Sequence, residues 1–349
     1  MRRRPISLAA GFGALGLCAL FAAWGWPVMP SYLAAWLVLI ALPAGALPLL
    51  MGLEIAGLGA GPTAASLRRL LGLLPVAGLL LLPVLANLEP LYGWSRGEAP
   101  ATAFAGIWFT PVFFCLRSLV YLALWLWLAG TFRRPPGDPP DPRRRSRAVL
   151  GLVLHAVVAT LAAEDWVQSV DPELGSTAFG LLVMAIQAGL ALSAAALIAA
   201  RDSSGRPGRD GRTAAAFADP MLVLLAIWGF LHAVQYLVVW SANLPEEARW
   251  YLARGGPLGR AAAWAALAVV VVSALALAPR RSAGRPAILA AVAGLILLLH
   301  GGELFWLVTP AFRGGFRFTL ADFLALVGVV GVAAGLYAPV ERRLRGGTS

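Results

Sequence analysis

Charged residues are scarce in this chain, and lysine is absent altogether. Only 13% of the 349 residues are charged, whereas 60% are hydrophobic. Soluble domains contain about 25% charged residues, so this composition excludes a soluble globular protein. All 28 cationic residues are arginines. The chain is therefore expected to be a polytopic membrane protein, in which the few polar side chains carry most of the functional information.

Cysteine and histidine are also rare. Cys18 and Cys115 lie in apolar stretches and form no CxxC motif, which argues against covalent haem, cysteine-ligated zinc and iron–sulfur clusters. The three histidines are expected at different depths, which disfavours a haem held by two of them. No Walker, HExxH or Ser/His/Asp pattern occurs. We therefore predict no directly bound cofactor, no metal and no catalytic residue in this chain.

Long apolar runs dominate the rest. A helix that crosses the ~30 Å hydrocarbon core needs ~20 apolar residues, and Pro, Gly and Arg divide the chain into ten such stretches. We predict an all-α protein with about ten transmembrane helices in a single integral membrane domain, 1–349. The predicted spans are 6–26, 31–53, 69–88, 105–130, 148–167, 176–200, 219–241, 258–278, 286–308 and 320–339.

The arginines fall mainly in alternate connections between these spans. The side of the membrane with fewer arginines contains Arg96, Arg249, Arg254, Arg260, Arg313 and Arg317. The positive-inside rule then places both termini in the cytoplasm. Arginines in short connections also disfavour a nucleic-acid surface and favour contacts with anionic lipids of the bilayer. Two connections rich in Arg, Pro and Gly, 133–147 and 201–212, are expected to be flexible cytoplasmic loops.

Two segments, 164–180 and 228–251, join the polar end of a span to a loop rich in acidic residues and Trp. In the second, a short helix is expected to lie on the outer surface, or to be a plain amphipathic connector. Asn243 is suited to cap this helix, and acidic residues favour its first turn. We predict docking or helix positioning for Asp171, Asn243, Glu246, Glu247 and Trp250.

Several polar residues are expected inside the membrane. Arg117 lies in the middle of a predicted span, where an arginine costs at least ~2.5 kcal/mol, so it needs an ion-pair partner or a polar cavity. Trp228, His232 and Gln235 share one helical face. His300 and Glu303 are three residues apart, and they form either a proton relay or a structural pair.

Other polar residues extend this pattern towards both membrane surfaces. We expect His155 and Gln187 within spans, Glu54 at an inner span end, and Asp165 and Asp322 at outer span ends. Acids at both surfaces, with His, Gln and Arg between them, are what a proton path needs. The alternative is that the terminal acids are solvated or cap helices.

Three stretches show a resemblance to a known family. They are EDWVQSVDPELGSTAFGLLVMA (164–185), HAVQYLVVWSANLPEEARWY (232–251) and WFTPVFFCLRSLVYLALWLWLAGTFRR (108–134). They resemble the ActF-type membrane subunit of alternative complex III, a quinol:cytochrome c oxidoreductase, within the NrfD-like superfamily. The resemblance covers most of the chain from about residue 90. The matched motif positions include Arg117, Asp165, Asp171, Gln235, Asn243, Glu246 and Glu247.

The resemblance implies two four-helix bundles with flanking helices, and no haem or metal in this subunit. It implies a scaffold with proton-translocating capacity, in a complex of the bacterial inner membrane. The implied partners are an NrfD-like quinol-binding subunit, a multihaem cytochrome c and an iron–sulfur protein, with quinol bound at the level of the complex. Two alternatives remain from the residues: a secondary transporter or channel, which favours inverted repeats and broken helices, and a purely structural membrane anchor.

Overall fold

The computed structural model describes residues 3–98, 102–137, 141–203, 210–279 and 285–346. Within these ranges the secondary structure is helical and contains no strand. Ten of the helices are long and apolar enough to cross a membrane. The predictions of an all-α fold and of about ten spans are therefore confirmed, and the chain is a multi-pass membrane protein.

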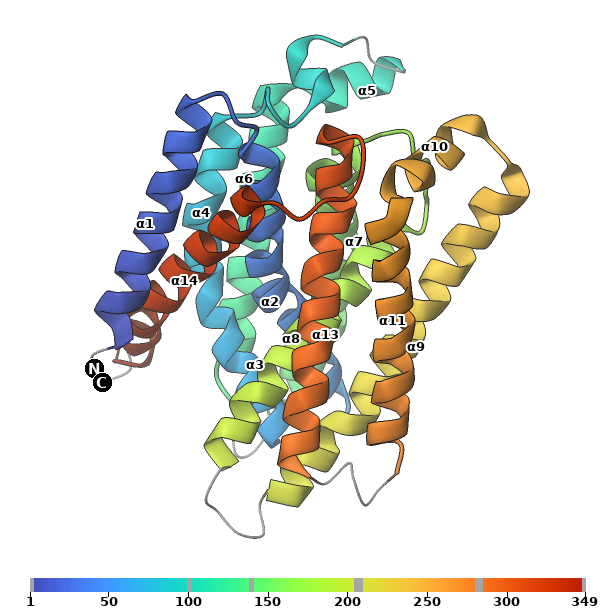
Figure 1. The fold of residues 1–349 in the computed structure, drawn as a ribbon. Helices are drawn as coiled ribbons and strands as arrows, with labels where there is room; N and C mark the ends of the chain where they lie inside the picture. Colours follow the sequence, from blue (N-terminus) through green and yellow to red (C-terminus); the bar gives the residue numbers. More distant parts are fainter. Residues whose placement is uncertain (1–2, 99–101, 138–140, 204–209, 280–284, 347–349) are drawn as a thin grey trace.

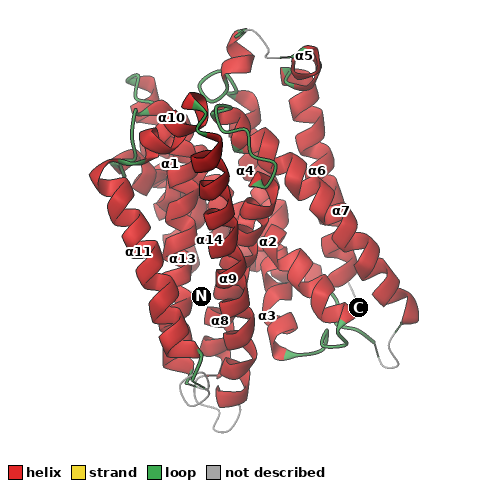
Figure 2. Cartoon of the chain, turned by 90° about the vertical axis from the view of Figure 1, so that its right-hand side faces the viewer, coloured by secondary structure: helices red, strands yellow, loops and turns green. Residues whose placement is uncertain are grey.

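The helices follow the chain in this order (Figure 1): α1 (Arg3–Ala23), α2 (Met29–Ile55), α3 (Pro62–Leu70), α4 (Leu74–Ala86), α5 (Ala103–Trp108), α6 (Pro111–Phe132), α7 (Pro142–Trp166), α8 (Phe179–Ser203), α9 (Asp210–Ala242), α10 (Pro245–Arg254), α11 (Gly256–Leu277), α13 (Pro286–Val308) and α14 (Leu320–Gly346). A short 3-10 turn, Leu71–Leu73, joins α3 to α4 within the third span. Both views place α5 and α10 at one end of the molecule, which we call the α10 end (Figures 1 and 2). Helix α3 lies towards the opposite end, which we call the α3 end.

The long helices form two neighbouring bundles. In the first bundle α2, α4, α6 and α7 contact one another, and in the second bundle α8, α9, α11 and α13 do so. Helix α2 also packs along α8, which joins the bundles, while α1 and α14 pair beside α2 as flanking helices. Short connections make sequential helices antiparallel neighbours, so each bundle consists of helices that lie close together in the sequence. It is the arrangement that the sequence resemblance implies.

Close contact between the bundles depends on a glycine in α2. A Cβ atom at Gly45 would overlap the main-chain carbonyl of Gln187 in α8. Small residues let transmembrane helices approach closely, which is needed because lipid provides little hydrophobic force between helices. The α1–α14 pair uses the same device, since a Cβ at Gly11 would lie 2.5 Å from the Val332 nitrogen.

Several predicted span boundaries differ from those of the structure. Span 105–130 is two helices, α5 and α6, because Pro111 disfavours a helical conformation at the preceding Thr110 and then occupies the first turn of α6. The third span begins at Pro62 rather than at 69. Arg68 and Arg69 therefore lie in the last turn of α3, not in a connecting loop.

The two predicted flexible loops are shorter than expected. Residues 142–147 form the start of α7, because Pro142 suits a first turn and Asp141 caps it by accepting a bond from the Arg143 nitrogen. Helix α8 continues to Ser203, and α9 begins at Asp210. Of the two predicted loops, residues 138–140 and 204–209 lie outside the described residues.

Candidate functional sites within the two bundles

A buried carboxylate, Glu303 of α13, is the centre of a polar cluster in the second bundle. The Trp228 indole nitrogen on α9 donates to both carboxylate oxygens, at 3.0 and 2.9 Å. His232 Nε2 lies 2.6 Å from Oε1, and His300 Nδ1 lies 3.1 Å from Oε2. The structure therefore brings together four residues that the sequence singled out, and it shows that Trp228 is a direct hydrogen-bond donor to Glu303.

The two imidazoles differ in their surroundings. The His232 side chain is 26% exposed, whereas that of His300 is 1% exposed. His300 packs on α8, where a Cβ at Gly189 would lie 2.5 Å from its Nε2. A carboxylate between two imidazoles can pass a proton from one to the other, because each group accepts and releases protons. This cluster, which we call the Glu303 cluster, thus connects the surface of the bundle with its interior.

The chain of hydrogen-bonded side chains in the Glu303 cluster ends at His300. The gap next to its ring is lined by Ser193, Met221 and Ile296, among others, and is too narrow for a water molecule. The Ser193 hydroxyl and the Gln187 side-chain oxygen are buried and have no hydrogen-bond partner among the described residues. A proton that reaches His300 therefore needs a local rearrangement of α8 or α13 to continue.

Gln235 is not part of the Glu303 cluster, although it shares a helical face with Trp228 and His232. Its side-chain oxygen accepts a hydrogen bond from the Ser176 hydroxyl, in the segment before α8. Because Ser176 precedes a helix of the same bundle, this bond fixes the α10 end of α9 to the chain entering α8.

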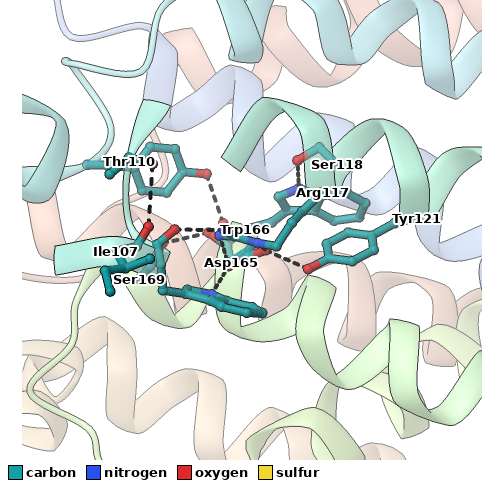
Figure 3. Close-up of polar contacts among 10 residues, drawn as sticks. Ile107, Thr110, Arg117, Ser118, Tyr121, Asp165, Trp166 and Ser169 are labelled. Carbon is teal, nitrogen blue, oxygen red and sulfur yellow. Dashed lines mark hydrogen bonds and ion pairs between the residues drawn. The ribbon is translucent and has the colours of Figure 1, made fainter. Parts of the chain in front are cut away.

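A second cluster lies at the α10 end of the first bundle (Figure 3). Figure 3 shows Arg117 and Tyr121 of α6 directed at Asp165 of α7. Arg117 forms a bidentate ion pair with Asp165, at 2.9 and 2.8 Å, and the Tyr121 hydroxyl donates to the same carboxylate at 2.8 Å. The Trp108 indole adds a fourth donor at 3.0 Å. Asp165 is 0% exposed, and its carboxylate is fully satisfied.

Arg117 is less deep than the sequence indicates. Helix α6 begins at Pro111, so Arg117 is six residues into the helix, about 9 Å along its axis. Its third nitrogen donates to the Trp108 carbonyl at 2.7 Å, and its guanidinium lies 4.1 Å from the Trp108 ring centroid. The arginine is therefore held from all sides by an ion pair, a carbonyl and an aromatic face, which favours a structural role.

A third cluster closes the α3 end of the first bundle. Glu54 of α2 binds Arg68 of α3 at 2.7 Å and Arg144 of α7 through two bonds of 2.8 Å. Arg68 also donates to the Phe132 carbonyl at 3.1 Å. The sequence assigned Arg144 to a flexible loop, but it lies in the first turn of α7 and joins two other helices. Glu54 thus connects α2 with α3 and α7, and it is not an open entrance to a proton path.

His155 lies between these two clusters of the first bundle. It is 2% exposed, and neither of its ring nitrogens has a hydrogen-bond partner among the described residues. The Trp125 indole nitrogen, whose ring is 6.1 Å away, is similarly unsatisfied. Buried polar groups without partners usually contact an ordered water. Towards Arg144, however, apolar atoms of Met51 and Leu128 pack against Gly151 of α7.

Asp322 serves as a cap at the start of α14. Its carboxylate accepts two bonds from Arg313, at 2.7 and 3.0 Å, and one from the Thr319 backbone nitrogen at 2.7 Å. Arg313 also donates to Ser31 of α2. The capping alternative therefore describes Asp322 better than a proton-path role. Taken together, the predicted path residues form separate groups and do not converge on one route.

The acidic segments at the α10 end are held by Arg254, which the sequence analysis did not single out. Arg254 is 1% exposed and binds Asp171 at 2.9 Å, the Leu307 carbonyl at 2.9 Å and the Trp250 carbonyl at 3.1 Å. Its guanidinium lies 3.6 Å from the Trp250 ring centroid. Burial lowers the pKa of Arg254 to about 10, so it stays charged at neutral pH.

Helix α10 begins differently from the prediction. Its N-cap is Leu244, and Asn243 instead adopts a left-handed conformation with φ 51° after the end of α9. Asn tolerates that conformation better than most residues, so Asn243 terminates α9 and does not cap α10. Glu246 and Glu247 do occupy the first turn of α10, where the helix dipole favours negative charge.

Replacing Arg254 with lysine should lower the free energy of unfolding by about 1.5–3 kcal/mol, because charge-assisted hydrogen bonds and a planar stack are lost. Thermal unfolding in mild detergent would measure this. Arg249→Lys is the matched control, since Arg249 is on the same helix in an exposed pair with Glu173 at 3.4 Å. Equal effects of the two substitutions would show that Arg254 does not hold this end together.

Among the described residues, no group of three or more His, Cys, Asp or Glu side chains is arranged to hold a metal ion. The polar groups that converge in space are ion pairs and the Glu303 cluster. A scan against protein-family models finds no match to this chain, and a search of curated proteins finds none either.

Proposed function

We propose that this chain is a membrane subunit of a quinol-oxidising electron-transfer complex of the alternative complex III type, in which it acts as a scaffold and carries protons at Glu303. The observation that carries the proposal is the Glu303 cluster, a buried carboxylate shared by two imidazoles and an indole. The three stretches of sequence resemblance and the two-bundle architecture support the assignment to this kind of complex.

The Glu303 cluster is suited to hold a proton within the membrane. A buried ionised carboxylate is costly unless neighbouring groups compensate its charge. Here His232 or His300 can carry the compensating proton, so the cluster accepts or releases a proton without leaving a carboxylate unpaired. The ion pairs of the first bundle differ, because Arg117 and Arg144 keep their charge permanently and their acids have no proton to exchange.

Oxidation of a quinol releases electrons as well as protons, and the electrons need redox centres. In the proposal these belong to the partner subunits: an NrfD-like quinol-binding subunit, a multihaem cytochrome c and an iron–sulfur protein. Their membrane is the bacterial inner membrane. The distribution of arginines supports an orientation with both termini in the cytoplasm and the α10 end outside. Asp171, Glu246, Glu247 and Trp250 would then lie on the side where soluble redox subunits dock.

A purely structural anchor is the second candidate function. The two ion-pair clusters of the first bundle favour it, because each satisfies its charges internally and offers no exchangeable proton. A secondary transporter has less support. It favours matched broken helices in two halves. In the described part of the second bundle, the 3-10 turn Thr309–Phe312 follows the end of α13 and does not divide a span into two helices, as the turn between α3 and α4 does.

Purification in mild detergent tests the proposal. We expect the chain to co-elute with a multihaem cytochrome and an iron–sulfur protein, detected by haem absorbance and mass spectrometry. Elution alone, as a stable homo-oligomer that binds a solute, would contradict both the proposed complex and the anchor role and would support a transporter.

Charge reversal at the α10 end tests whether the partner subunits dock there. Glu246→Lys on α10 is expected to reduce the co-eluting haem, because Glu246 is exposed in the proposed docking segment. Glu98→Lys is the matched control, since Glu98 is a 62% exposed acid at the same end but outside that segment. Equal haem recovery in both variants would reject docking at α10 while leaving the complex itself in place.

A further inference from the structure

An apolar groove runs along the outside of the first bundle, between α2, the α3–α4 region, α8 and α14. Its volume is about 650 Å³. The walls are mainly aliphatic and include Val38, Leu42, Leu73, Ile198, Val330 and Ala334. Val330 is 45% exposed and Ala334 is also exposed, so the groove is open at the side of the helices, where bilayer lipid lies.

The groove is polar only towards the α3 end. There it is lined by Arg69, whose side chain is 38% exposed, and by Tyr337 of α14. The Tyr337 hydroxyl donates to the Arg69 carbonyl at 2.9 Å, and the Tyr337 ring packs against Gly72. These contacts attach the end of α14 to α3, and they leave the Arg69 guanidinium beside the mouth of the groove.

The groove extends along the helices from the middle of α2 and α14 towards the α3 end. Val38 and Leu42 lie near the middle of α2, and from Val330 to Tyr337 the α14 axis advances about 10 Å. The groove therefore extends from the middle of the membrane to the arginine-rich membrane surface. An aliphatic channel that ends at a cation has the polarity of an acyl chain with an anionic headgroup.

We propose that this groove is a binding site for an anionic phospholipid, with an acyl chain between α2 and α14 and the phosphate at Arg69. Lipid tails are as apolar as the groove, so burial alone gives little preference over bulk lipid, and selectivity depends on the headgroup. A guanidinium recognises phosphate through charge-assisted hydrogen bonds, and basic pockets between transmembrane helices bind such headgroups. The proposal does not depend on the proposed function.

Arg69 has a partner already, and this partner does not prevent lipid binding. Its guanidinium lies 2.6 Å from Asp202, which is 52% exposed. Exposed ion pairs of this kind contribute little free energy, so a phosphate can replace Asp202 or share the guanidinium. Arg68 is different, because it is buried and committed to Glu54. Among the described residues that line the groove, Arg69 is therefore the cation that can bind a headgroup.

Native mass spectrometry of the full-length chain tests the site, with phosphatidylglycerol and phosphatidylethanolamine as probes. We expect the chain to retain phosphatidylglycerol preferentially, and Arg69→Ala to reduce retention about fivefold. Arg96→Ala is the matched control, because Arg96 also forms an exposed ion pair, with Glu98, at the other end of the molecule. Ala334→Phe, which narrows the groove and changes no charge, should also reduce retention.

Three results would overturn the proposal. They are equal retention of the two lipids by the unmodified chain, equal loss in the Arg69 and Arg96 variants, and retention of a neutral isoprenoid quinone in place of phospholipid. Unchanged thermal unfolding of Arg69→Ala in lipid-free detergent would show that its fold is intact, so that lost retention reports the site itself.

Discussion

Replacing Asp165 with alanine should lower the free energy of unfolding by about 3–5 kcal/mol, the usual effect of removing one partner of a buried ion pair. The substitution leaves Arg117 buried without its bidentate partner, and it removes the acceptor of the Tyr121 and Trp108 donors. Thermal and denaturant unfolding in mild detergent would measure the loss. Glu173→Ala is the control, because Glu173 forms an exposed pair with Arg249 at 3.4 Å.

A double substitution distinguishes the free-energy cost of a buried, unpaired charge from the stabilisation that the ion pair itself provides. Arg117→Met together with Asp165→Leu removes both charges and fills similar volume, so it should recover most of the stability that Asp165→Ala loses. If the double variant were as unstable as the single one, the stability would come from the hydrogen bonds of Tyr121 and Trp108. A small effect of Asp165→Ala alone would show that water reaches Arg117.

The sequence predicted the helices well because each one is a local pattern. An apolar run of sufficient length crosses the bilayer whatever its partners are, and ten such runs were recognisable. Boundaries failed where polar residues extend a helix beyond the apolar core, as in Arg68 of α3 and Arg144 of α7. Both arginines bind Glu54, a partner that hydropathy does not reveal.

The candidate site was predictable only within single helices. The spacing of His300 and Glu303 places them on one face, and the same holds for Trp228 and His232. That these two faces meet depends on how α9 packs against α13, across 75 residues between Trp228 and Glu303. The same limit applies to Arg117 and Asp165, whose separate roles were predicted but not their ion pair.

Arg254 was missed because it was grouped with the surface arginines. Its spacing from Trp250 was a usable signal, since residues four apart on a helix are neighbours and an arginine readily stacks on an indole. His155 illustrates the opposite error. Its buried position was expected, but the structure gives it no polar contact among the described residues, so the proton path through the first bundle has no support there.

Replacing Glu303 with glutamine should slow proton transfer through the second bundle about 100-fold, the lower range for loss of a positioned acid–base group, and reduce quinol oxidation much less. Glutamine keeps the shape and one acceptor oxygen for Trp228, but it cannot take up a proton from His232 or His300. The measurement is the number of protons released per electron in vesicles that contain the complete complex.

The controls distinguish proton transfer from support of the fold. Glu303→Asp keeps a carboxylate and should preserve part of the proton yield, whereas Trp228→Phe removes a hydrogen bond but no titratable group and should leave the yield unchanged. An unchanged proton-to-electron ratio in Glu303→Gln, together with an unchanged rate of quinol oxidation, would reject the relay and favour a structural role for the cluster. An equal loss of proton release and quinol oxidation would instead show that Glu303 supports the structure of the complex. A defect confined to proton transfer would lower proton release more than quinol oxidation.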